Sequence, residues 1–252
     1  MNEPEVSVVI PFYNEEGNVL PLFEELLPVL RGMERSFEVV AVDDGSRDRT
    51  GDELNSVARL HREVRHLRFP SNRGQSAAFK AGFEAARGRF IVTMDGDLQI
   101  DPADLPPMLD LLEREGVDLV HGWRRERRDP FLKRVSTRIA NAVRNRLTGE
   151  RIHDTGCPLK VFRREALEEL PPFDGMHRFF ITLAHMRGFR SREMVVRHRH
   201  RRSGESKYGI RNRVFRALRD CLVVRWMQKR YVRSDAEELG PVRTSSEEKV
   251  TR

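Results

Sequence analysis

The first half of the chain alternates between short β-branched segments and amphipathic segments of helical length, and this alternation is its strongest constraint on fold. Strands are predicted at residues 6–10, 37–42, 64–69, 90–94 and 118–123, and helices at residues 18–33, 50–61, 75–87 and 104–115. Strands that alternate with helices of this length form a mostly parallel sheet with helices on both faces. The sequence therefore predicts an α/β fold.

Acidic residues follow two of these predicted strands. Asp43 and Asp44 come directly after the second strand, and Asp95, Gly96 and Asp97 follow the fourth. Ligands of parallel sheets bind outside the carboxyl ends of the strands. We therefore expect these carboxylates to meet at one edge of the sheet and to form part of a binding site there.

The spacing of Asp95, Gly96 and Asp97 suits a metal ion. Carboxylates at positions i and i+2 of a turn can converge on one hard cation, and the glycine lets backbone approach a phosphate closely. Taken alone, the triplet favours an ordinary Asp-Gly turn. The second acidic strand end favours a ligand, because two carboxylate clusters repel unless a cation or hydrogen-bond donor lies between them. A metal-bound nucleoside diphosphate would meet that need.

The two halves of the chain differ in charge. Residues 1–120 contain 13 basic and 23 acidic side chains, whereas residues 121–252 contain 33 and 16. A basic second half indicates an anionic partner such as a nucleic acid, a phospholipid or a phosphorylated substrate. Aromatic residues make up only 8% of the chain, and it has no RNA-binding motif. We therefore expect no nucleic-acid partner.

The second half is less regular. Helices are predicted at residues 133–147, 178–187 and 210–232, strands at residues 157–163 and 194–198, and a flexible tail at residues 233–252. The basic amphipathic helix at 210–232 contains Trp226, which is typical of a helix that lies on an anionic membrane surface. Its apolar stripe includes Leu218, Cys221 and Leu222. The alternative is that this stripe packs on the domain.

Several protein classes are disfavoured by what the sequence lacks. It has no P-loop, no dinucleotide-binding glycine motif after its first strand and no Gly-x-Ser-x-Gly elbow. No segment has the roughly 20 apolar residues of a spanning helix. The N-terminus has no basic signal-peptide region, and two cysteines make no disulfide framework. We therefore expect a cytoplasmic location, peripheral on the cytoplasmic face of the membrane, with no transmembrane helix.

Six motifs occur in order along the chain. They are Val8-Val-Ile-Pro-Phe-Tyr-Asn-Glu15, Val42-Asp-Asp-Gly-Ser-Arg-Asp48, Asn72-Arg-Gly-Gln75, Asp95-Gly-Asp-Leu-Gln99, Asp154-Thr-Gly-Cys-Pro-Leu-Lys160 and Gly204-Glu-Ser-Lys-Tyr208. Over residues 5–230 the chain therefore resembles family 2 glycosyltransferases with the GT-A fold, in particular their polyprenyl-phosphate (dolichol-phosphate mannosyltransferase-like) branch. The resemblance implies inverting transfer of a sugar from a nucleotide-diphosphate sugar to a polyprenyl phosphate.

The resemblance also implies roles for individual residues. The residues implied to contact the nucleotide sugar are Pro11, Tyr13, Glu15, Asp43, Asp95 and Gly96. The ligands implied for Mg²⁺ or Mn²⁺ are Asp95, Asp97 and Gln99. The residues implied to act in catalysis are Asp97, Arg124, Arg201 and Lys207, with Ser206 in the loop that closes on the phosphates. For any one of these arginines the alternative is a solvated surface charge.

A phosphate acceptor would need no general base, because a monophosphate with a second pKa of about 6 is already ionised at neutral pH. Two alternatives remain: the same fold with a soluble glycan or small hydroxyl acceptor, and, more remotely, a basic nucleic-acid-binding protein. For the domain organisation we expect one GT-A domain over residues 1–232. It would comprise a nucleotide-sugar half at 1–120, an acceptor half at 121–208 and the amphipathic helix at 210–232.

Overall fold

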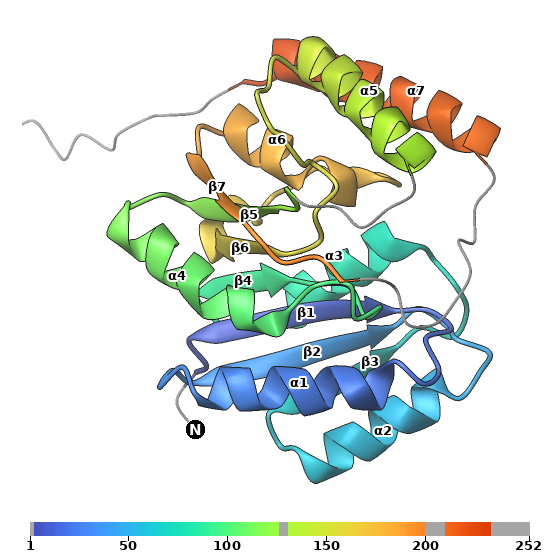
Figure 1. The fold of residues 1–252 in the computed structure, drawn as a ribbon, viewed down its shortest axis with the longest axis vertical. Helices are drawn as coiled ribbons and strands as arrows, with labels where there is room; N and C mark the ends of the chain where they lie inside the picture. Colours follow the sequence, from blue (N-terminus) through green and yellow to red (C-terminus); the bar gives the residue numbers. More distant parts are fainter. Residues whose placement is uncertain (1–2, 126–130, 200–209, 233–252) are drawn as a thin grey trace, which may run out of the picture.

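The protein is described here by a computed structural model that covers residues 3–125, 131–199 and 210–232, with side chains in α5 and α7 from residues 140 and 217 onward. Its strands are β1 (Val6–Phe12), β2 (Phe37–Asp43), β3 (Val64–Arg68), β4 (Phe90–Thr93), β5 (Leu119–Trp123), β6 (Lys160–Arg163) and β7 (Ser191–Val195). They form one sheet in the order β3-β2-β1-β4-β6-β5-β7 (Figure 1). Only β6 runs antiparallel to its neighbours, β4 and β5. The predicted mostly parallel sheet is confirmed.

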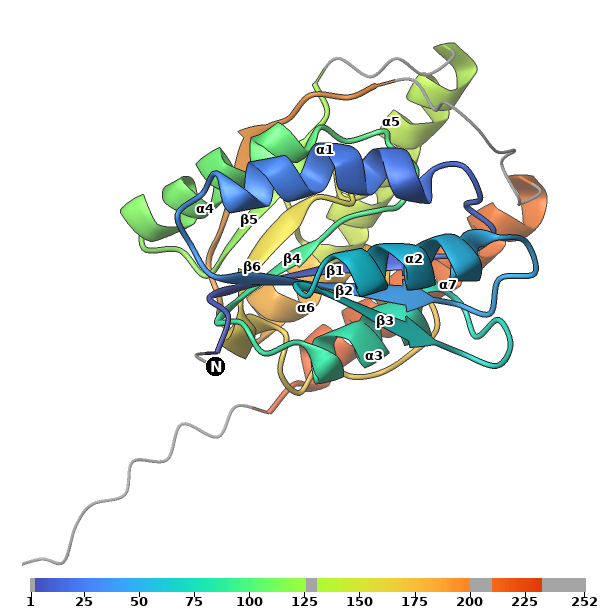
Figure 2. The ribbon, with the colours of Figure 1, turned by 90° about the horizontal axis from the view of Figure 1, so that it is seen from below.

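Helices cover both faces of the sheet. They are α1 (Val19–Arg31), α2 (Thr50–Leu60), α3 (Gln75–Ala85), α4 (Leu105–Arg114), α5 (Phe131–Thr148), α6 (Phe180–Met186) and α7 (Ile210–Arg230), with short 3-10 turns at Pro102–Asp104, Arg164–Ala166 and Met176–Arg178. Figure 2 shows α1 and α4 on one side of the sheet and α3 and α6 on the other. The predicted α/β class and the helices of the first half are confirmed, with ends that differ by a few residues.

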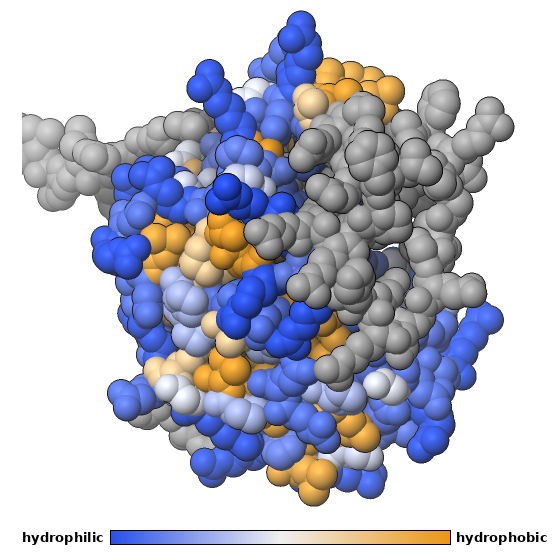
Figure 3. Space-filling view, in the orientation of Figure 1, coloured by the Kyte–Doolittle hydropathy of each residue, from blue (hydrophilic) through white to orange (hydrophobic). Residues whose placement is uncertain are grey.

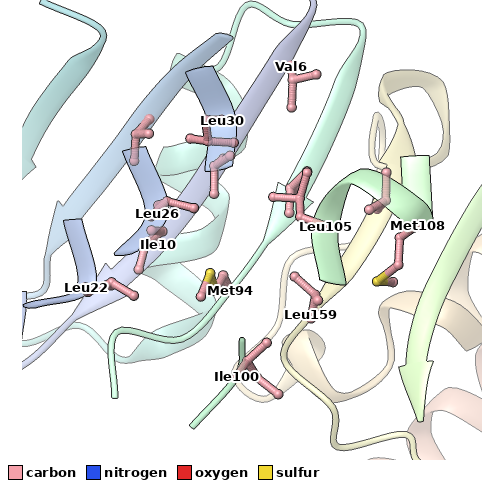
Figure 4. Close-up of a cluster of buried hydrophobic side chains, with 14 of the residues drawn as sticks. Val6, Ile10, Leu22, Leu26, Leu30, Met94, Ile100, Leu105, Met108 and Leu159 are labelled. Carbon is pink, nitrogen blue, oxygen red and sulfur yellow. The ribbon is translucent and has the colours of Figure 1, made fainter. Parts of the chain in front are cut away.

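Each face of the sheet buries its own hydrophobic cluster. On one face, Leu22, Leu26 and Leu30 recur at helical spacing along α1 and point toward Ile10 of β1 (Figure 4). These side chains are fully buried. Removing each leucine from water contributes about 1.5–3 kcal/mol. The apolar spacing that predicts this helix is therefore also what fixes it on the sheet.

Three predicted strand boundaries were wrong, and one of them is that the strand expected at 157–163 begins only at Lys160. Pro11 was expected to end the first strand, but β1 continues to Phe12, with Pro11 in register with Val42 of β2. Proline lacks an N–H, but the carbonyl oxygen of Val9 accepts from Met94, so Pro11, two residues further on, also faces the β4 side, where β4 has already ended. The strand expected at 194–198 lies at Ser191–Val195, because the chain leaves β5 after Val195.

The helix α7 lies beside α5 at one end of the molecule (Figure 1). Cys221 and Val224 of α7 are buried, whereas Leu218, Leu222 and Trp226 are exposed. The predicted apolar stripe is thus divided: Cys221 faces the protein, and the other three face solvent. In the part of the chain that the structure describes, no helix has the length and hydropathy needed to cross a membrane.

Candidate functional site

The strand order places the candidate site outside the carboxyl ends of β1 and β4. These two strands are parallel neighbours, although the chain passes through β2 and β3, on the other side of β1, before it reaches β4. A reversal of this kind opens a crevice at the carboxyl ends of the strands. The arrowheads of β1, β2 and β4 point to the same edge (Figure 1). Most of the predicted nucleotide-sugar residues follow these three strands.

Asp95 and Asp97 lie close together just beyond β4. Asp95 is partly buried, and Gln75, the first residue of α3, donates a hydrogen bond from Nε2 to Asp95 Oδ1 over 2.9 Å. The backbone N–H of Gln99 donates to Asp97 Oδ1 over 3.2 Å. Burial, and then the charge of Asp97, raise the pKa of Asp95 to about 7. The fold thus brings the carboxyl groups of Asp95 and Asp97 together, and their charges repel each other when both are ionised.

The donor chemistry of this pair fits Mg²⁺ or Mn²⁺. Asp95 and Asp97 supply carboxylate oxygens and Gln99 an amide oxygen, which are the hard ligands that these cations prefer. A cation between the carboxylates would remove the repulsion that raises the pKa of Asp95. Among the described residues, no group of three or more His, Cys, Asp or Glu side chains is arranged to hold a metal. Diphosphate oxygens and water would therefore have to supply the remaining ligands.

The turn that carries these residues depends on two unusual positions. Leu98 has φ 60°, a left-handed conformation that side chains other than glycine seldom adopt. Gly96 packs against Phe12 of β1, and a Cβ atom at Gly96 would lie 2.6 Å from Cε1 of that ring. The predicted role of Gly96 was close approach to a phosphate. Its packing against Phe12 is a second, purely structural requirement for glycine.

A buried ion pair lies on the β5 side of this turn. Arg124, the residue after β5, donates from Nε to Asp154 Oδ2 over 2.7 Å and from Nη2 to Asp154 Oδ1 over 3.0 Å. Both side chains are buried. Burial acts to lower the pKa of Arg124, but the hydrogen bonds and charge of Asp154 outweigh it, so the pKa is raised and the guanidinium stays charged. This charge is close enough to Asp95 to favour its ionised form.

Lys160 is a second buried basic side chain beside Asp95. It begins β6 and donates from Nζ to the carbonyl oxygen of Cys157. Burial lowers the pKa of Lys160, while the charges of Asp95 and Asp154 act in the opposite direction. The sequence motif that ends in Lys160 was identified without a role for its lysine. Only the antiparallel pairing of β6 with β4 brings this lysine next to Asp95.

The loop after β1 is held by the loop after β2. The backbone N–H of Asn14 donates to Ser46 Oγ over 3.0 Å, and that of Glu15 donates to Thr50 Oγ1 over 2.8 Å. Asn14 itself has φ 50°. The structure thus places Tyr13 and Glu15, both predicted to contact the nucleotide, at the edge that carries Asp95, and the charge of Glu15 acts to raise the pKa of Asp95.

The two aspartates after β2 have different surroundings. Asp43 is fully buried, with Oδ1 accepting the backbone N–H of Ser46 over 2.8 Å and Oδ2 lying 3.2 Å from Arg68 Nε. Asp44 instead accepts the backbone N–H groups of Arg73 and Gly74, over 2.7 Å and 2.9 Å. Asp44 therefore orders the turn that leads into α3 and Gln75. The sequence singled out Asp43 for the nucleotide and missed this function of Asp44.

Three predicted residues, Arg201, Ser206 and Lys207, lie outside the described part of the chain, and their roles stay predictions. The segment that leads to them is anchored beside the acidic turn. His198 forms an isolated antiparallel bridge with Ile100, and the backbone N–H of Arg199 donates to the carbonyl oxygen of Gln99 over 2.8 Å. Sequence reasoning missed this pairing, which joins the end of the β7 segment to the predicted metal turn.

Comparison with curated proteins identifies relatives over most of the chain. It is 40% identical over 229 residues to the dodecaprenyl-phosphate galacturonate synthase of Rhizobium johnstonii, covering 89% of this chain and 68% of the relative. It is 39% identical over 204 residues to the undecaprenyl-phosphate 4-deoxy-4-formamido-L-arabinose transferase of Pseudomonas paraeruginosa, covering 81% of this chain and 60% of that protein. The chain thus spans about three fifths to two thirds of these relatives.

Solved structures share the fold. The mannosyltransferase of Pyrobaculum calidifontis in complex with GDP-Man and Mn²⁺ matches with a TM-score of 0.55 at 24% identity, over 78% of this chain and 57% of that one. The glucosyl-3-phosphoglycerate synthase of Mycobacterium tuberculosis in complex with Mn²⁺ and UDP-Glc matches with a TM-score of 0.62 at 21% identity, over 92% and 81%. Residues 7–171 match the family model for glycosyl transferase family 2. The chain therefore belongs to glycosyl transferase family 2 and has the GT-A fold.

Proposed function

We propose that this protein transfers a sugar, with inversion, from a nucleotide-diphosphate sugar to a polyprenyl phosphate, and that the reaction depends on Mg²⁺ or Mn²⁺. The observation that carries the proposal is the pair Asp95 and Asp97 at the carboxyl ends of β1 and β4, with the buried Arg124 guanidinium close by. This pair fits a cation on a diphosphate, and the arginine fits a second anion. The two curated relatives are both named for transfer to a polyprenyl phosphate.

In the proposed reaction the main task of the protein is to bind two anions side by side, the donor diphosphate and the acceptor phosphate. The acceptor phosphate is ionised at neutral pH and needs no base to become a nucleophile. When bound, the divalent cation neutralises charge that develops on the departing nucleoside diphosphate. Asp95 and Asp97 would hold that cation, while Tyr13, Glu15 and Asp43 would hold the nucleotide. Arg124 would orient the acceptor phosphate and offset its charge.

We further propose that the enzyme works at a membrane surface, on its cytoplasmic face, without inserting a helix. Leu218, Leu222 and Trp226 form an exposed apolar row on α7, beside the basic and exposed Arg219 and Arg225. Hydrophobic side chains are visible at the end of the molecule where α5 and α7 lie (Figure 3). A row of this kind can lie among lipid headgroups while basic residues attract anionic lipid.

The catalytic proposal is tested by transfer of radiolabelled sugar to polyprenyl monophosphate in detergent. A screen of nucleoside diphosphates with Mn²⁺, read as a rise in melting temperature, first identifies the donor base. We expect labelled lipid with the parent protein and none with Asp97→Asn, which removes one ligand charge. Asp110→Asn is the matched control, because Asp110 is an exposed carboxylate on α4. Label found only on a soluble glycan or small hydroxyl compound would contradict the lipid acceptor.

The membrane proposal has a separate test. Vesicles that contain anionic lipid should carry the protein upward in a density gradient at low salt, and less so at high salt. Leu222→Glu with Trp226→Glu should abolish this flotation. Leu60→Glu should not, because Leu60 is an even more exposed leucine that lies on α2, away from α5 and α7. Flotation that is unchanged in the α7 variant would refute contact through this helix.

A further inference from the structure

The ion pair between Arg124 and Asp154 is part of a larger structure that the proposed reaction leaves unexplained. The Asp154 carboxylate accepts three hydrogen bonds from Arg124: two from the guanidinium and one from the backbone N–H, which lies 3.3 Å from Oδ2. Nε and Nη2 of the guanidinium are both used by the carboxylate. Among the described residues, no hydrogen bond to Nη1 is found, and a further anion would have to bind at this nitrogen.

The loop that carries Asp154 is fixed from one side by α5. Asn145 donates from Nδ2 to the carbonyl oxygen of Ile152 over 2.8 Å, and Asn141 donates from Nδ2 to that of His153 over 2.9 Å. Asn141 Oδ1 in turn accepts a hydrogen bond from Thr155 Oγ1 over 2.9 Å. One face of α5 therefore holds the backbone just before Asp154 and the side chain of the residue after it.

The same loop is fixed from the other side by the sheet. The ring of His153 stacks on Trp123, with centroids 4.2 Å apart and planes 17° from parallel. Glu193 of β7 accepts the backbone N–H of His153 over 2.8 Å. Trp123 precedes Arg124 and His153 precedes Asp154, so two neighbouring residues on each segment are paired with two on the other. This leaves the ion pair little freedom to rotate.

We propose that Asp154 is a positioning residue: it fixes the Arg124 guanidinium in the orientation that receives the acceptor phosphate, and α5 fixes Asp154. The inference rests on the proposed function and assigns Asp154 a role in binding the acceptor. Because the carboxylate already neutralises the guanidinium, the contribution of Arg124 depends on its direction as much as on its charge. A planar guanidinium held in advance loses less conformational freedom when it binds a phosphate.

The test is a double-mutant cycle that follows the acceptor and the donor separately. Asp154→Asn should raise KM for polyprenyl monophosphate by about tenfold or more, as for loss of one charge-assisted contact. Affinity for the nucleoside diphosphate with Mn²⁺, measured by calorimetry, should stay within about twofold of the parent. In an Arg124→Met background, Asp154→Asn should cause no further rise in KM, because it acts through Arg124.

A matched control separates positioning from stability. Arg178 and Asp220 form a second Arg–Asp pair, 2.8 Å apart and partly buried, that joins the Met176–Arg178 turn to α7. Asp220→Asn should lower the melting temperature and leave KM for the acceptor unchanged. If Asp154→Asn does not fold, Asn141→Ala replaces it, because it loosens the loop without unpairing a buried charge; we expect KM for the acceptor to rise about threefold.

The outcomes distinguish the two proposals. If the parent transfers sugar to the lipid phosphate but Asp154→Asn, or Asn141→Ala in its place, keeps the parent KM, the positioning role is refuted and the function stands. An additional rise in KM in the Arg124→Met background would also refute it, since Asp154 would then act on its own. If the parent neither binds nor glycosylates polyprenyl monophosphate, the proposed function fails, and the acceptor role of the pair fails with it.

Discussion

Asp95 gives the metal-free protein a pH-dependent stability that Asp95→Asn should remove. Burial and the charge of Asp97 raise the pKa of this carboxyl from 3.8 to about 7. Because the folded value is raised, the stabilisation from the bound proton is complete below the unfolded pKa and is lost as the pH rises through 7. Asparagine resembles the protonated carboxyl in shape and charge, so the variant should lose less stability than the parent over this range.

The magnitude follows from the displacement of the pKa. Each tenfold change in proton affinity corresponds to about 1.4 kcal/mol, so the whole effect is about 4 kcal/mol, of which about 3 kcal/mol falls between pH 5 and 8. This is an upper value, because Asp95 keeps some exposure to solvent. For a domain of this size, a loss of about 3 kcal/mol in the free energy of unfolding lowers the melting temperature of the parent by about 6–12 °C relative to that of Asp95→Asn.

The assay is calorimetric melting of the parent, Asp95→Asn and the surface control Asp110→Asn in chelator, at several pH values from 5 to 8. The parent and the surface control should lose stability together as the pH rises, while Asp95→Asn should lose less. Excess Mn²⁺ with a nucleoside diphosphate should restore the parent at pH 8 but not help the variant. Parallel pH profiles for all three proteins would show that the carboxyl pair is not under the repulsion inferred here.

Three further predictions concern the same edge of the sheet. Binding of Mn²⁺ with a nucleoside diphosphate should release close to one proton at pH 6 and almost none at pH 8, beyond what the nucleotide releases when it binds Mn²⁺ in free solution, because Asp95 must ionise; calorimetry in buffers of different ionisation enthalpy measures this, and no excess release at pH 6 would contradict it. Gly96→Ala should destabilise the fold by about 1–3 kcal/mol in urea unfolding, since the new methyl group meets the Phe12 ring; Phe12→Leu should recover part of the loss, and additive losses would refute the clash. Arg201→Ala and Lys207→Ala should each lower kcat/KM at least about tenfold if these side chains close on the phosphates, and unchanged kinetics in both would make them ordinary surface charges.

The side chains that surround the turn at Asp95 and Asp97 could not be predicted from the sequence. Gln75 belongs to a motif that the sequence identified, but nothing in the pattern indicates that its amide contacts Asp95. Lys160 and Asp154 likewise lie within a recognised motif, about 60 residues along the chain from that carboxylate. The apolar residues on either side of Lys160 in the sequence do not indicate that this lysine will be buried next to Asp95. The antiparallel return of β6 between β4 and β5 creates that contact.

The sequence alone determined the alternation of strands and helices, the family and the acidic residues at the strand ends, because hydrophobic periodicity and short motifs are local properties of a chain. The tertiary structure decided which charges face each other. It paired Arg124 with Asp154 and placed Lys160 beside Asp95. It also made Asp44 the hydrogen-bond acceptor that orders the turn before α3. These contacts depend on strand order and burial, which set the distance between groups far apart in sequence and the cost of leaving them uncompensated.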